Sequence, residues 1–467
     1  MPQEATKVIK LQLEASEEIF RSLDGQSKIC NWLYNRFLEK ANGLKQEFIQ
    51  TKDIQTAKTL YSERGLRNLL PPLKNEFPFL KSVHSSPLKN SALRLSHAIQ
   101  ARQQSRKGKR RGKEVGWPRF RSWQASWFSL LFDEPNKGFK VLGNNLQISL
   151  GMGDERKQKS LLFILKEAHL LKNQEIRNLR LVKQAGIYYA VFTVRILLID
   201  KKLLKRVIAL DPNHKNMAYG VDIEGRSIEI AAPYWLKNYD KRVDELKSKR
   251  DRCDKRAKKV IVTDLHGNSI GKEIRLPSKR WQKYQRALEK ALHKRQEQTK
   301  TFVYTLAHKL CQQYDCIGIG DYTPQGNGIT TSMRRAMNNR SLIGRFKEAV
   351  KWVALKSGKT FIEYDEKGTT RTCHCCEYVN AEGLCPSIRK WECPSCLTNH
   401  MRDENAAQNG LKLVLRDLLK KGETVVSLVS GSGLVSVIER WAWCVLPSGV
   451  QNALQGSKQQ LIAASRN

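Results

Sequence analysis

The chain has 467 residues, enough for two to four domains, and its 83 lysines and arginines against 45 acidic residues give a formal net charge of +38. So large an excess would destabilise a compact protein by self-repulsion unless a polyanion neutralises it, so nucleic acid is the expected partner. A membrane role is disfavoured, because the sequence has no run of 18 apolar residues and its first ten residues lack the hydrophobic segment of a signal peptide. Eleven scattered cysteines without a secretory signal indicate reduced thiols in an intracellular protein.

The first 200 residues predict a strand, a helical block and a set of short strands. Residues 7–14 alternate apolar and polar side chains, as a strand does, and residues 15–117 carry apolar side chains at helical intervals. From residue 118 to 200, short apolar runs separated by Gly and Asn turns predict an antiparallel barrel that the first strand could complete. The expected organisation is a β-barrel from residues 1–14 and 118–200, with a helical domain inserted at 15–117.

A basic run at residues 101–123 carries nine Lys or Arg and one acidic residue. By itself such a run is typical of a solvated or disordered segment, and it also fits a nuclear localisation signal weakly. Aromatic residues within it favour nucleic acid, because their faces can stack on bases while neighbouring arginines reach phosphates. The predicted nucleic-acid-binding residues are Arg106, Lys107, Lys109, Arg110, Arg111, Trp117, Arg119, Phe120 and Arg121.

Strand-like runs begin again after Lys205, and Asp211 ends the first of them. A carboxylate at the tip of a buried strand is held rigidly and can bind a metal ion, although Asp211-Pro212-Asn213 also fits an ordinary turn. Asp222 is a rival that lies beside the turn at Glu224-Gly225.

Residues 236–312 predict a long helical hairpin, with the first arm running to Val260 and a loop between the arms. The other faces of both arms are dense in Lys and Arg. They either line a channel for a nucleic-acid duplex or form a solvated surface.

Four cysteines near the C-terminus form two C-x2-C pairs. Cys373 with Cys376 and Cys393 with Cys396 are separated by sixteen residues, which is within the usual spacing of a four-thiolate zinc site. Two such pairs close a tetrahedron with no open position, so they predict a structural zinc ion; four unrelated buried thiols are the alternative. Cys375 is spare by this spacing and could replace a neighbour in the first pair.

Asp403 opens a run of apolar residues at helical intervals, so its carboxylate is expected at a helix N-terminus, where an N-cap role is the ordinary interpretation. The parts around it stand in a specific order: T-T-R-T-C at Thr369–Cys373, the two cysteine pairs, and R-D-x-N-A-A-x-N at Arg402–Asn409. This order resembles the C-terminal end of TnpB proteins. These are transposon-encoded, RNA-guided DNA nucleases related to type V CRISPR effectors and to eukaryotic Fanzor proteins.

The resemblance implies an α/β multidomain chain with an RNase H-like (RuvC) nuclease domain and an inserted zinc ribbon. The barrel would be the wedge domain and its helical insertion the recognition domain, since Gly116–Phe120 resembles the G-x-P-R-F segment that precedes the second part of that barrel. The implied boundaries are 201–372 and 397–417 for the nuclease domain, with the basic hairpin at 236–312, 373–396 for the zinc ribbon, and 418–467 for a tail that the resemblance does not cover.

In TnpB proteins the carboxylate that matches Asp403 is the last of three metal ligands, and another is usually a Glu at the position of Gly320. The glycine departs from that pattern, so either the site is inactive or another carboxylate replaces the Glu. Fanzor proteins and some TnpB relatives carry this Glu just before the T-S-x-x-C segment, which is the place of Glu366.

Glu366 is preferred over its acidic neighbours because strand alternation puts it on one face with Ile362 and Tyr364. Glu363 and Asp365 fall on the opposite face, and Asp321 is a further rival.

The implied function is RNA-guided DNA cleavage, in which Asp211, Glu366 and Asp403 bind two Mg²⁺ ions and guide pairing with a short adjacent motif selects the target. Arg402 joins the predicted nucleic-acid-binding residues. The expected partners are a guide RNA from the protein's own locus and double-stranded target DNA. The expected location is the cytoplasm and nucleoid of a prokaryote, or the nucleus if the protein is Fanzor-like. Two alternatives stay open: a nuclease-dead RNA-guided repressor, suggested by Gly320, and a DNA-strand transferase.

Overall fold

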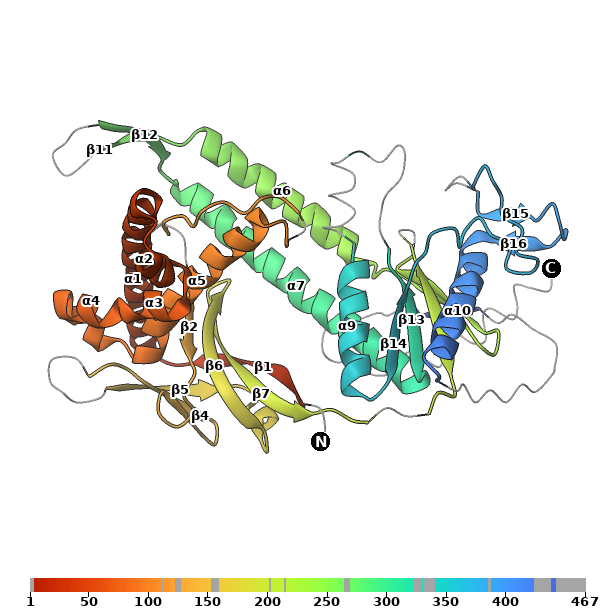
Figure 1. Cartoon of the computed structure of the whole chain (residues 1–467), viewed down its shortest axis with the longest axis horizontal. Coiled ribbons are helices and arrows are strands. Elements are labelled where there is room, and N and C mark those ends of the chain that lie inside the picture. The colour runs from red at the N-terminus through yellow and green to blue at the C-terminus, as the bar shows by residue number, and fades with distance from the viewer. Residues whose placement is uncertain are drawn as a thin grey trace. The chain divides into compact units, whose positions relative to one another are not determined.

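The computed structural model describes residues 4–110, 112–121, 127–152, 159–200, 203–213, 216–263, 269–322, 330, 341–384, 388–423 and 438–441. The chain divides between Leu197 and Leu198 into two compact units, called here the N-terminal unit and the C-terminal unit (Figure 1). The finer domain boundaries expected from the sequence stay predictions. None of the described helices combines the length and the apolar character that a membrane crossing requires.

The N-terminal unit contains a helical block and one antiparallel sheet. Its elements are β1 (Glu4–Glu14), α1 (Glu17–Thr51), α2 (Ile54–Tyr61), α3 (Glu63–Asn68), α4 (Leu70–Glu76), α5 (Ser85–Arg106), β2 (Ser129–Phe132), β3 (Phe139–Leu142), β4 (Asn145–Ser149), β5 (Ser160–Leu165), β6 (Glu175–Gln184) and β7 (Ile187–Leu197). The strand order is β2-β6-β7-β1-β5-β4-β3. The predicted first strand is therefore central, pairing with β7 along Glu4–Gln12 and with β5 through Leu13 and Glu14. No pairing between the outer strands β2 and β3 is found in the described part, so barrel closure stays a prediction.

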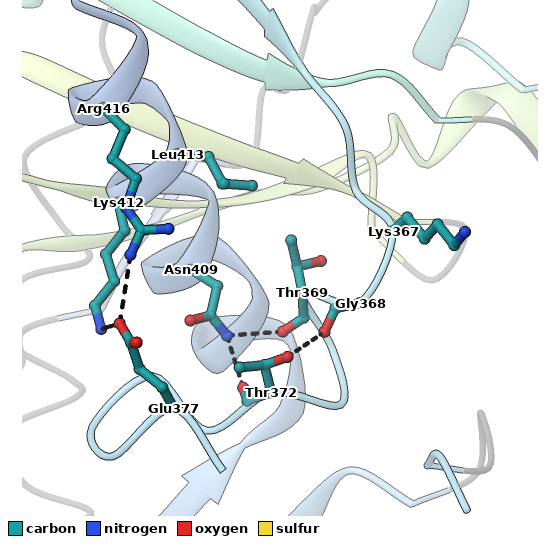
Figure 2. A pocket seen from close by; sticks show the side chains of 9 residues that line it. All are labelled: Lys367, Gly368, Thr369, Thr372, Glu377, Asn409, Lys412, Leu413 and Arg416. Carbon is teal, nitrogen blue, oxygen red and sulfur yellow. Dashed lines mark hydrogen bonds and ion pairs between the residues drawn. The ribbon is translucent and has the colours of Figure 1, made fainter. Parts of the chain in front are cut away.

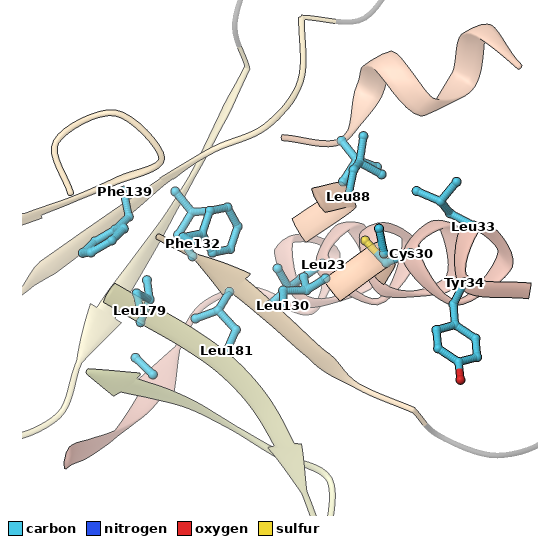
Figure 3. Close-up of a cluster of buried hydrophobic side chains, with 14 of the residues drawn as sticks. Leu23, Cys30, Leu33, Tyr34, Leu88, Leu130, Phe132, Phe139, Leu179 and Leu181 are labelled. Atoms are coloured by element: carbon cyan, nitrogen blue, oxygen red, sulfur yellow. The ribbon is translucent and has the colours of Figure 1, made fainter. Parts of the chain in front are cut away.

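Helix α1 begins after Ser16, whose hydroxyl accepts a hydrogen bond from the Ile19 N–H, and two glutamates follow in its first turn. Its apolar residues recur at three- and four-residue steps, so they share one face. Figure 3 shows this face beside Leu130 of β2 and Leu181 of β6. Each fully buried leucine or phenylalanine here contributes about 1.5–3 kcal/mol, which fixes the helical block against the sheet.

The C-terminal unit is built on a mixed sheet. Its elements are β8 (Val207–Pro212), β9 (Ala218–Asp222), β10 (Ser227–Ile230), α6 (Trp235–Lys255), β11 (Lys259–Thr263), β12 (Ser269–Arg275), α7 (Lys279–Gln313), β13 (Cys316–Gly320), α9 (Ile343–Lys356), β14 (Thr360–Tyr364), β15 (Lys390–Glu392), β16 (Asn399–Met401), α10 (Arg402–Lys420) and β17 (Ile438–Trp441). The strand order is β14-β13-β8-β9-β10-β17. Strand β13 runs parallel to β8 and β14, whereas β9 is antiparallel to β8 and β10.

Alternation along the strands assigns each side chain to one of two cores. Ile208 and Leu210 of β8 pack in the core that includes α7 and α9, whereas Val207 and Ala209 pack with α10. Because strand side chains alternate between faces, Asp211 belongs to the α10 side. Figure 1 shows α10 along one side of β13 and β14. The acidic first turn of α10 therefore belongs to the face that Asp211 occupies.

Two parts of the C-terminal unit differ from the sequence-based expectation. Helix α6 ends at Lys255, so the predicted helical arm to Val260 is wrong, and the connection to α7 contains the antiparallel pair β11–β12 rather than a plain loop. The β-branched residues of β11 favour a strand over a helix. In the predicted tail, β17 pairs in parallel with β10 and extends the sheet.

Candidate active site and metal centre

The three predicted carboxylates come from two strand ends and a helix start. Asp211 lies near the end of β8 and is 6% exposed, Glu366 follows β14 by two residues, and Asp403 is in the first turn of α10. Burial raises the pKa of Asp211 well above its usual range, and the negative charges of Glu366 and Asp403 raise it further, while Arg402 opposes them. The structure thus places Glu366 and Asp403 close enough to Asp211 for their charges to act on it.

Glu366 is half-buried, and one oxygen of its carboxylate has no donor among the described residues. Burial and then the charge of Asp321 raise its pKa to about 7, while the backbone N–H of Tyr322 and the ammonium of Lys347 oppose that rise. Its Oε1 is buried and accepts no hydrogen bond from any described residue. A buried acceptor without a donor destabilises a fold, and a cation with oxygen ligands, such as Mg²⁺, would satisfy it. Glu366 Oε1 is therefore available to a cation, although the oxygens of the three carboxylates do not all lie within 4.8 Å of one another.

Gly320 ends β13 opposite Tyr364 of β14, at the place where the sequence lacks the usual Glu. A Cβ atom added to this glycine would overlap Oε1, Cγ and Cδ of Glu366. The Glu366 side chain thus occupies the space into which a side chain at position 320 would extend. This geometry is the one expected if the carboxylate is supplied by the segment after β14 instead of by the end of β13.

Tyr364 connects the elements that carry the carboxylates. Its hydroxyl donates a hydrogen bond to the carbonyl oxygen of Leu210, the residue before Asp211, at 2.8 Å. A Cβ atom added to Gly410 of α10 would overlap the Tyr364 ring, so a glycine is needed there for the close approach of helix and strand. One buried side chain therefore sets the spacing between β8, β14 and α10.

Asp403 is in the first helical turn but is not the N-cap. The N-cap is Met401, which makes no capping hydrogen bond, so the N-cap interpretation of Asp403 is wrong. A carboxylate in the first turn is stabilised by the helix dipole. Nη1 of Arg389 also donates to both carboxylate oxygens, at 3.1 and 3.2 Å.

The rival carboxylates have local structural partners. Asp222 accepts hydrogen bonds from the backbone N–H groups of Glu224 and Arg226 and closes the predicted turn. Asp321 accepts from the Glu366 N–H at 3.3 Å. Glu363 forms an ion pair with Lys347, and Asp365 accepts from the Lys367 N–H. Asp222, Asp321 and Asp365 thus hold backbone N–H groups, and Glu363 is paired with a lysine.

The four predicted zinc ligands form a compact cluster, with all four sulfurs within 4.8 Å of one another. The Cys373–Cys396 and Cys376–Cys393 sulfur distances are 3.6 and 3.5 Å. A tetrahedral zinc site with Zn–S bonds of about 2.3 Å separates its sulfurs by about 3.8 Å, so the cluster can hold zinc.

His400 is a further ligand-type residue that the sequence analysis missed. Its Nε2 lies 3.1 Å from the Cys373 sulfur, and the two residues form a second possible metal-binding group with Cys375. The available signal was its position four residues after Cys396.

Two asparagines of α10 fasten the segment that leads into the cysteine cluster. Nδ2 of Asn405 and Nδ2 of Asn409 both donate to the carbonyl oxygens of Thr369 and Thr372, at 2.7–3.3 Å. Figure 2 shows Asn409 hydrogen-bonded to both threonines, and all three residues line a pocket of ≈ 250 Å³. Lys412 also lines this pocket. The asparagines of the R-D-x-N-A-A-x-N motif thus tie the cysteine cluster to the helix that carries Asp403.

Most described residues of the basic run are exposed. They are Arg106, Lys107, Lys109, Arg110, Arg119 and Phe120, of which the last is 58% exposed. Arg111 lies outside the described residues. Arg402 is half-buried beside the carboxylates rather than on an open surface.

Trp117 and Arg121 point into the N-terminal unit. The Trp117 indole N–H donates to Asn42 at 2.7 Å, and the Lys45 ammonium lies 4.7 Å from its ring centroid. Arg121 stacks on the Tyr34 ring at 3.8 Å. These two side chains therefore have intramolecular partners that a predicted base or phosphate contact would have to share or replace.

One family model matches the region that contains the T-T-R-T-C segment, both cysteine pairs and the R-D-x-N-A-A-x-N motif. The family described as Cas12f1-like, TNB domain, matches residues 344–409. TnpB-like proteins L79 and L770 of Acanthamoeba polyphaga mimivirus are each 30% identical over 152 residues, which is 31% of this chain but only 28% of either relative.

Among solved structures, a Cas12f1–sgRNA–target DNA complex matches 87% of this chain and 98% of its own chain, with a TM-score of 0.53 at 11% identity. This likeness shows a shared α/β multidomain, Cas12-like fold. Together with the family match and the mimivirus relatives, it shows that the chain is similar to Cas12f1-like and TnpB-like proteins.

Proposed function

We propose that the protein is an RNA-guided DNA endonuclease that hydrolyses phosphodiesters at Asp211, Glu366 and Asp403. The observation that carries this proposal is the convergence of these carboxylates on the α10 side of the sheet, with Glu366 filling the space beside Gly320. The order of the strands also supports an RNase H-like domain, because three antiparallel strands are followed by two parallel ones beside β8.

The carboxylates are suited to hold Mg²⁺, since their ligands are oxygens and Glu366 Oε1 lacks a donor among the described residues. Bound Mg²⁺ would supply the charge that activates water and stabilises the leaving 3′ oxygen. Glu366 would release its proton when it binds a cation, because its pKa is raised to about 7. Once Glu366 has lost its proton, Arg402 would neutralise part of the negative charge of Glu366 and Asp403 beside Asp211.

The four cysteines would hold zinc in a structural role, since two closed pairs leave no position for substrate. Through Asn405 and Asn409, the zinc ribbon would fix the start of α10 relative to the segment after β14. Zinc would therefore act on catalysis only by positioning Asp403.

The proposed partners are a guide RNA from the protein's own locus and double-stranded target DNA. The net charge of +38 and the exposed basic run support a polyanionic partner. The matched solved complex contains an sgRNA and a target DNA, which supports the same two classes here. In this proposal the helical block and sheet of the N-terminal unit serve as the recognition and wedge domains.

Plasmid cleavage in Mg²⁺ tests the proposal, using protein co-expressed with its own locus. Asp211→Ala and Glu366→Ala should each slow cleavage at least about 100-fold, the scale expected for losing a charge that stabilises the transition state, while RNA stays bound. Glu363→Gln is the matched control, because this residue of β14 points away from the site and pairs with Lys347. Its variant should cut at the wild-type rate.

A nuclease-dead, RNA-guided DNA-binding repressor is the second candidate, and Gly320 is the observation that favours it. Wild-type complex that binds its target tightly but cuts in neither Mg²⁺ nor Mn²⁺ would establish this function and refute the first. Joined rather than cut products would instead indicate a strand transferase.

A further inference from the structure

Two arginines of the N-terminal unit converge on one serine hydroxyl. Arg94 of α5 donates from Nη2 to Oγ of Ser129 at 2.5 Å, and Arg180 of β6 donates from Nη1 to the same oxygen at 3.1 Å. Neither guanidinium has an ion pair with a described carboxylate. We propose that Arg94 and Arg180, together with Arg121, bind a phosphodiester group of bound nucleic acid.

Arg121 lies close enough to Arg94 for the two charges to interact, and helix α1 holds it in place. Its backbone N–H donates to Asn35 Oδ1 at 2.8 Å, its carbonyl accepts from Asn35 Nδ2, and its Nη1 donates to Asn31 Oδ1 at 2.7 Å. The guanidinium lies 3.8 Å from the Tyr34 ring centroid. Since these partners are amides and a ring, Arg121 is positioned firmly, and no carboxylate among the described residues forms an ion pair with it.

The cluster is electrostatically unfavourable without an added anion. Burial, followed by the positive charges of Arg180 and Arg121, lowers the pKa of Arg94 to about 10. The nearest titratable thiol, Cys30, has its pKa raised to about 12 by burial, so it is neutral near pH 7 and supplies no negative charge. The three arginines are half-buried. Guanidinium groups that are partly removed from water are normally paired with carboxylates, so three that have only neutral partners among the described residues indicate a binding site for an anion.

A phosphodiester is the anion that suits these groups best. A guanidinium presents a planar fork of donors that matches the two free oxygens of a phosphate, and two forks meet at one point here. The exposed residues Arg119 and Phe120 directly precede Arg121, so a nucleic-acid backbone bound at the cluster would continue along the basic run. This inference rests on the proposed nucleic-acid partners, but it does not depend on cleavage.

Binding measurements over a series of KCl concentrations test the inference with two probes. The first is the locus RNA added to RNA-free protein, and the second is double-stranded target DNA added to the protein–RNA complex. Arg94→Gln and Arg180→Gln should each weaken binding of one probe and reduce the slope of log K against log[KCl] by about one. The affected probe identifies whether RNA or DNA supplies the phosphodiester. Arg64→Gln, an exposed arginine of α3, is the control for loss of one charge and should change neither slope.

Thermal unfolding of the nucleic-acid-free protein separates this role from a structural one. Removing one of three like charges should leave Tm unchanged or raise it, because repulsion within the cluster falls. Unchanged salt slopes for both probes would overturn the proposal. A lowered Tm with unchanged slopes would do so as well and would assign the cluster to folding.

Discussion

The C-terminal unit contains two candidate metal clusters of opposite construction. The thiol cluster comes from one short segment, and its four sulfurs lie within 4.8 Å of one another. The carboxylate cluster comes from β8, the segment after β14 and α10, and its oxygens form no such compact group among the described residues. A closed cluster is satisfied by one ion and contributes to folding, whereas an open cluster keeps coordination sites for substrate. Loss of the first should therefore damage structure, and loss of the second should damage chemistry.

The largest effect is expected when the thiol cluster loses one of its four ligands. Cys393→Ser should abolish zinc binding and unfold the ribbon, since Cys393 is fully buried and structural zinc sites contribute on the order of 10 kcal/mol to folding. Zinc content by elemental mass spectrometry and limited proteolysis of the ribbon would measure this. The matched control is Cys253→Ser, which removes a thiol of α6 that belongs to neither metal-binding group and should leave the zinc content unchanged. One zinc per chain in the Cys393 variant would contradict the closed four-thiolate site.

The second-largest effect is expected at Gly320, and it tests whether Glu366 occupies the space beside this glycine. Gly320→Glu should abolish cleavage, because its Cβ would overlap the Glu366 carboxylate. Combining it with Glu366→Gly should restore part of the rate, since the carboxylate then returns to the end of β13. Gly344→Glu is the control, because a Cβ added there meets no neighbouring atom. Wild-type cleavage by the single Gly320 variant would show that the two positions do not share one space.

A smaller effect is expected at Tyr364, which sets the spacing of the open cluster. Tyr364→Phe removes the hydrogen bond to the buried Leu210 carbonyl, a loss of about 1–3 kcal/mol. If a similar energy is lost in positioning Asp211, cleavage slows roughly tenfold. The control is Tyr378→Phe, at a residue that is 39% exposed. Equal rates for both variants would remove Tyr364 from the positioning role.

The same contrast explains what the sequence could predict. The thiol cluster follows from spacing alone, because its ligands are local and the C-x2-C turn fixes two sulfurs at once. Predicting Glu366 as a ligand needed two further arguments. One was strand alternation, which placed Glu366 on the same face as Ile362 and Tyr364, and the other was the resemblance to TnpB proteins. The packing of Ile362 and Tyr364 in the α10 core confirms that alternation.

Contacts between segments that lie far apart in the chain could not be predicted from the sequence. The inward packing of Trp117 depends on Asn42 and Lys45, and the arginine cluster depends on α5, β2 and β6 meeting at Ser129. The hydrogen bonds from Asn405 and Asn409 to the backbone of Thr369 and Thr372 could not be predicted for the same reason. A side chain that binds a remote backbone leaves no periodic signal in the sequence. Strand β11 was not predicted because its short run of β-branched residues lies within a Lys-rich stretch.

The smallest expected effect is a pH dependence of stability that only the open cluster should show. Glu366 ionises at about 4.5 when unfolded but at about 7 when folded, because burial and then Asp321 disfavour its charge. The folded metal-free protein therefore holds this proton more tightly than the unfolded chain, and stability falls as pH rises through this interval. Glu366→Gln has no proton to lose, so its Tm should match wild type near pH 5 and exceed it near pH 8.

Added Mg²⁺ should narrow the difference near pH 8 by stabilising wild type alone, since only wild type can bind it through this carboxylate. Glu363→Gln is the control and should show no pH-dependent difference, because Glu363 is exposed and paired with Lys347. If the Tm difference between Glu366→Gln and wild type did not change from pH 5 to pH 8, Glu366 would be ionised in the fold throughout. The buried oxygen without a donor would then need a partner other than a bound cation.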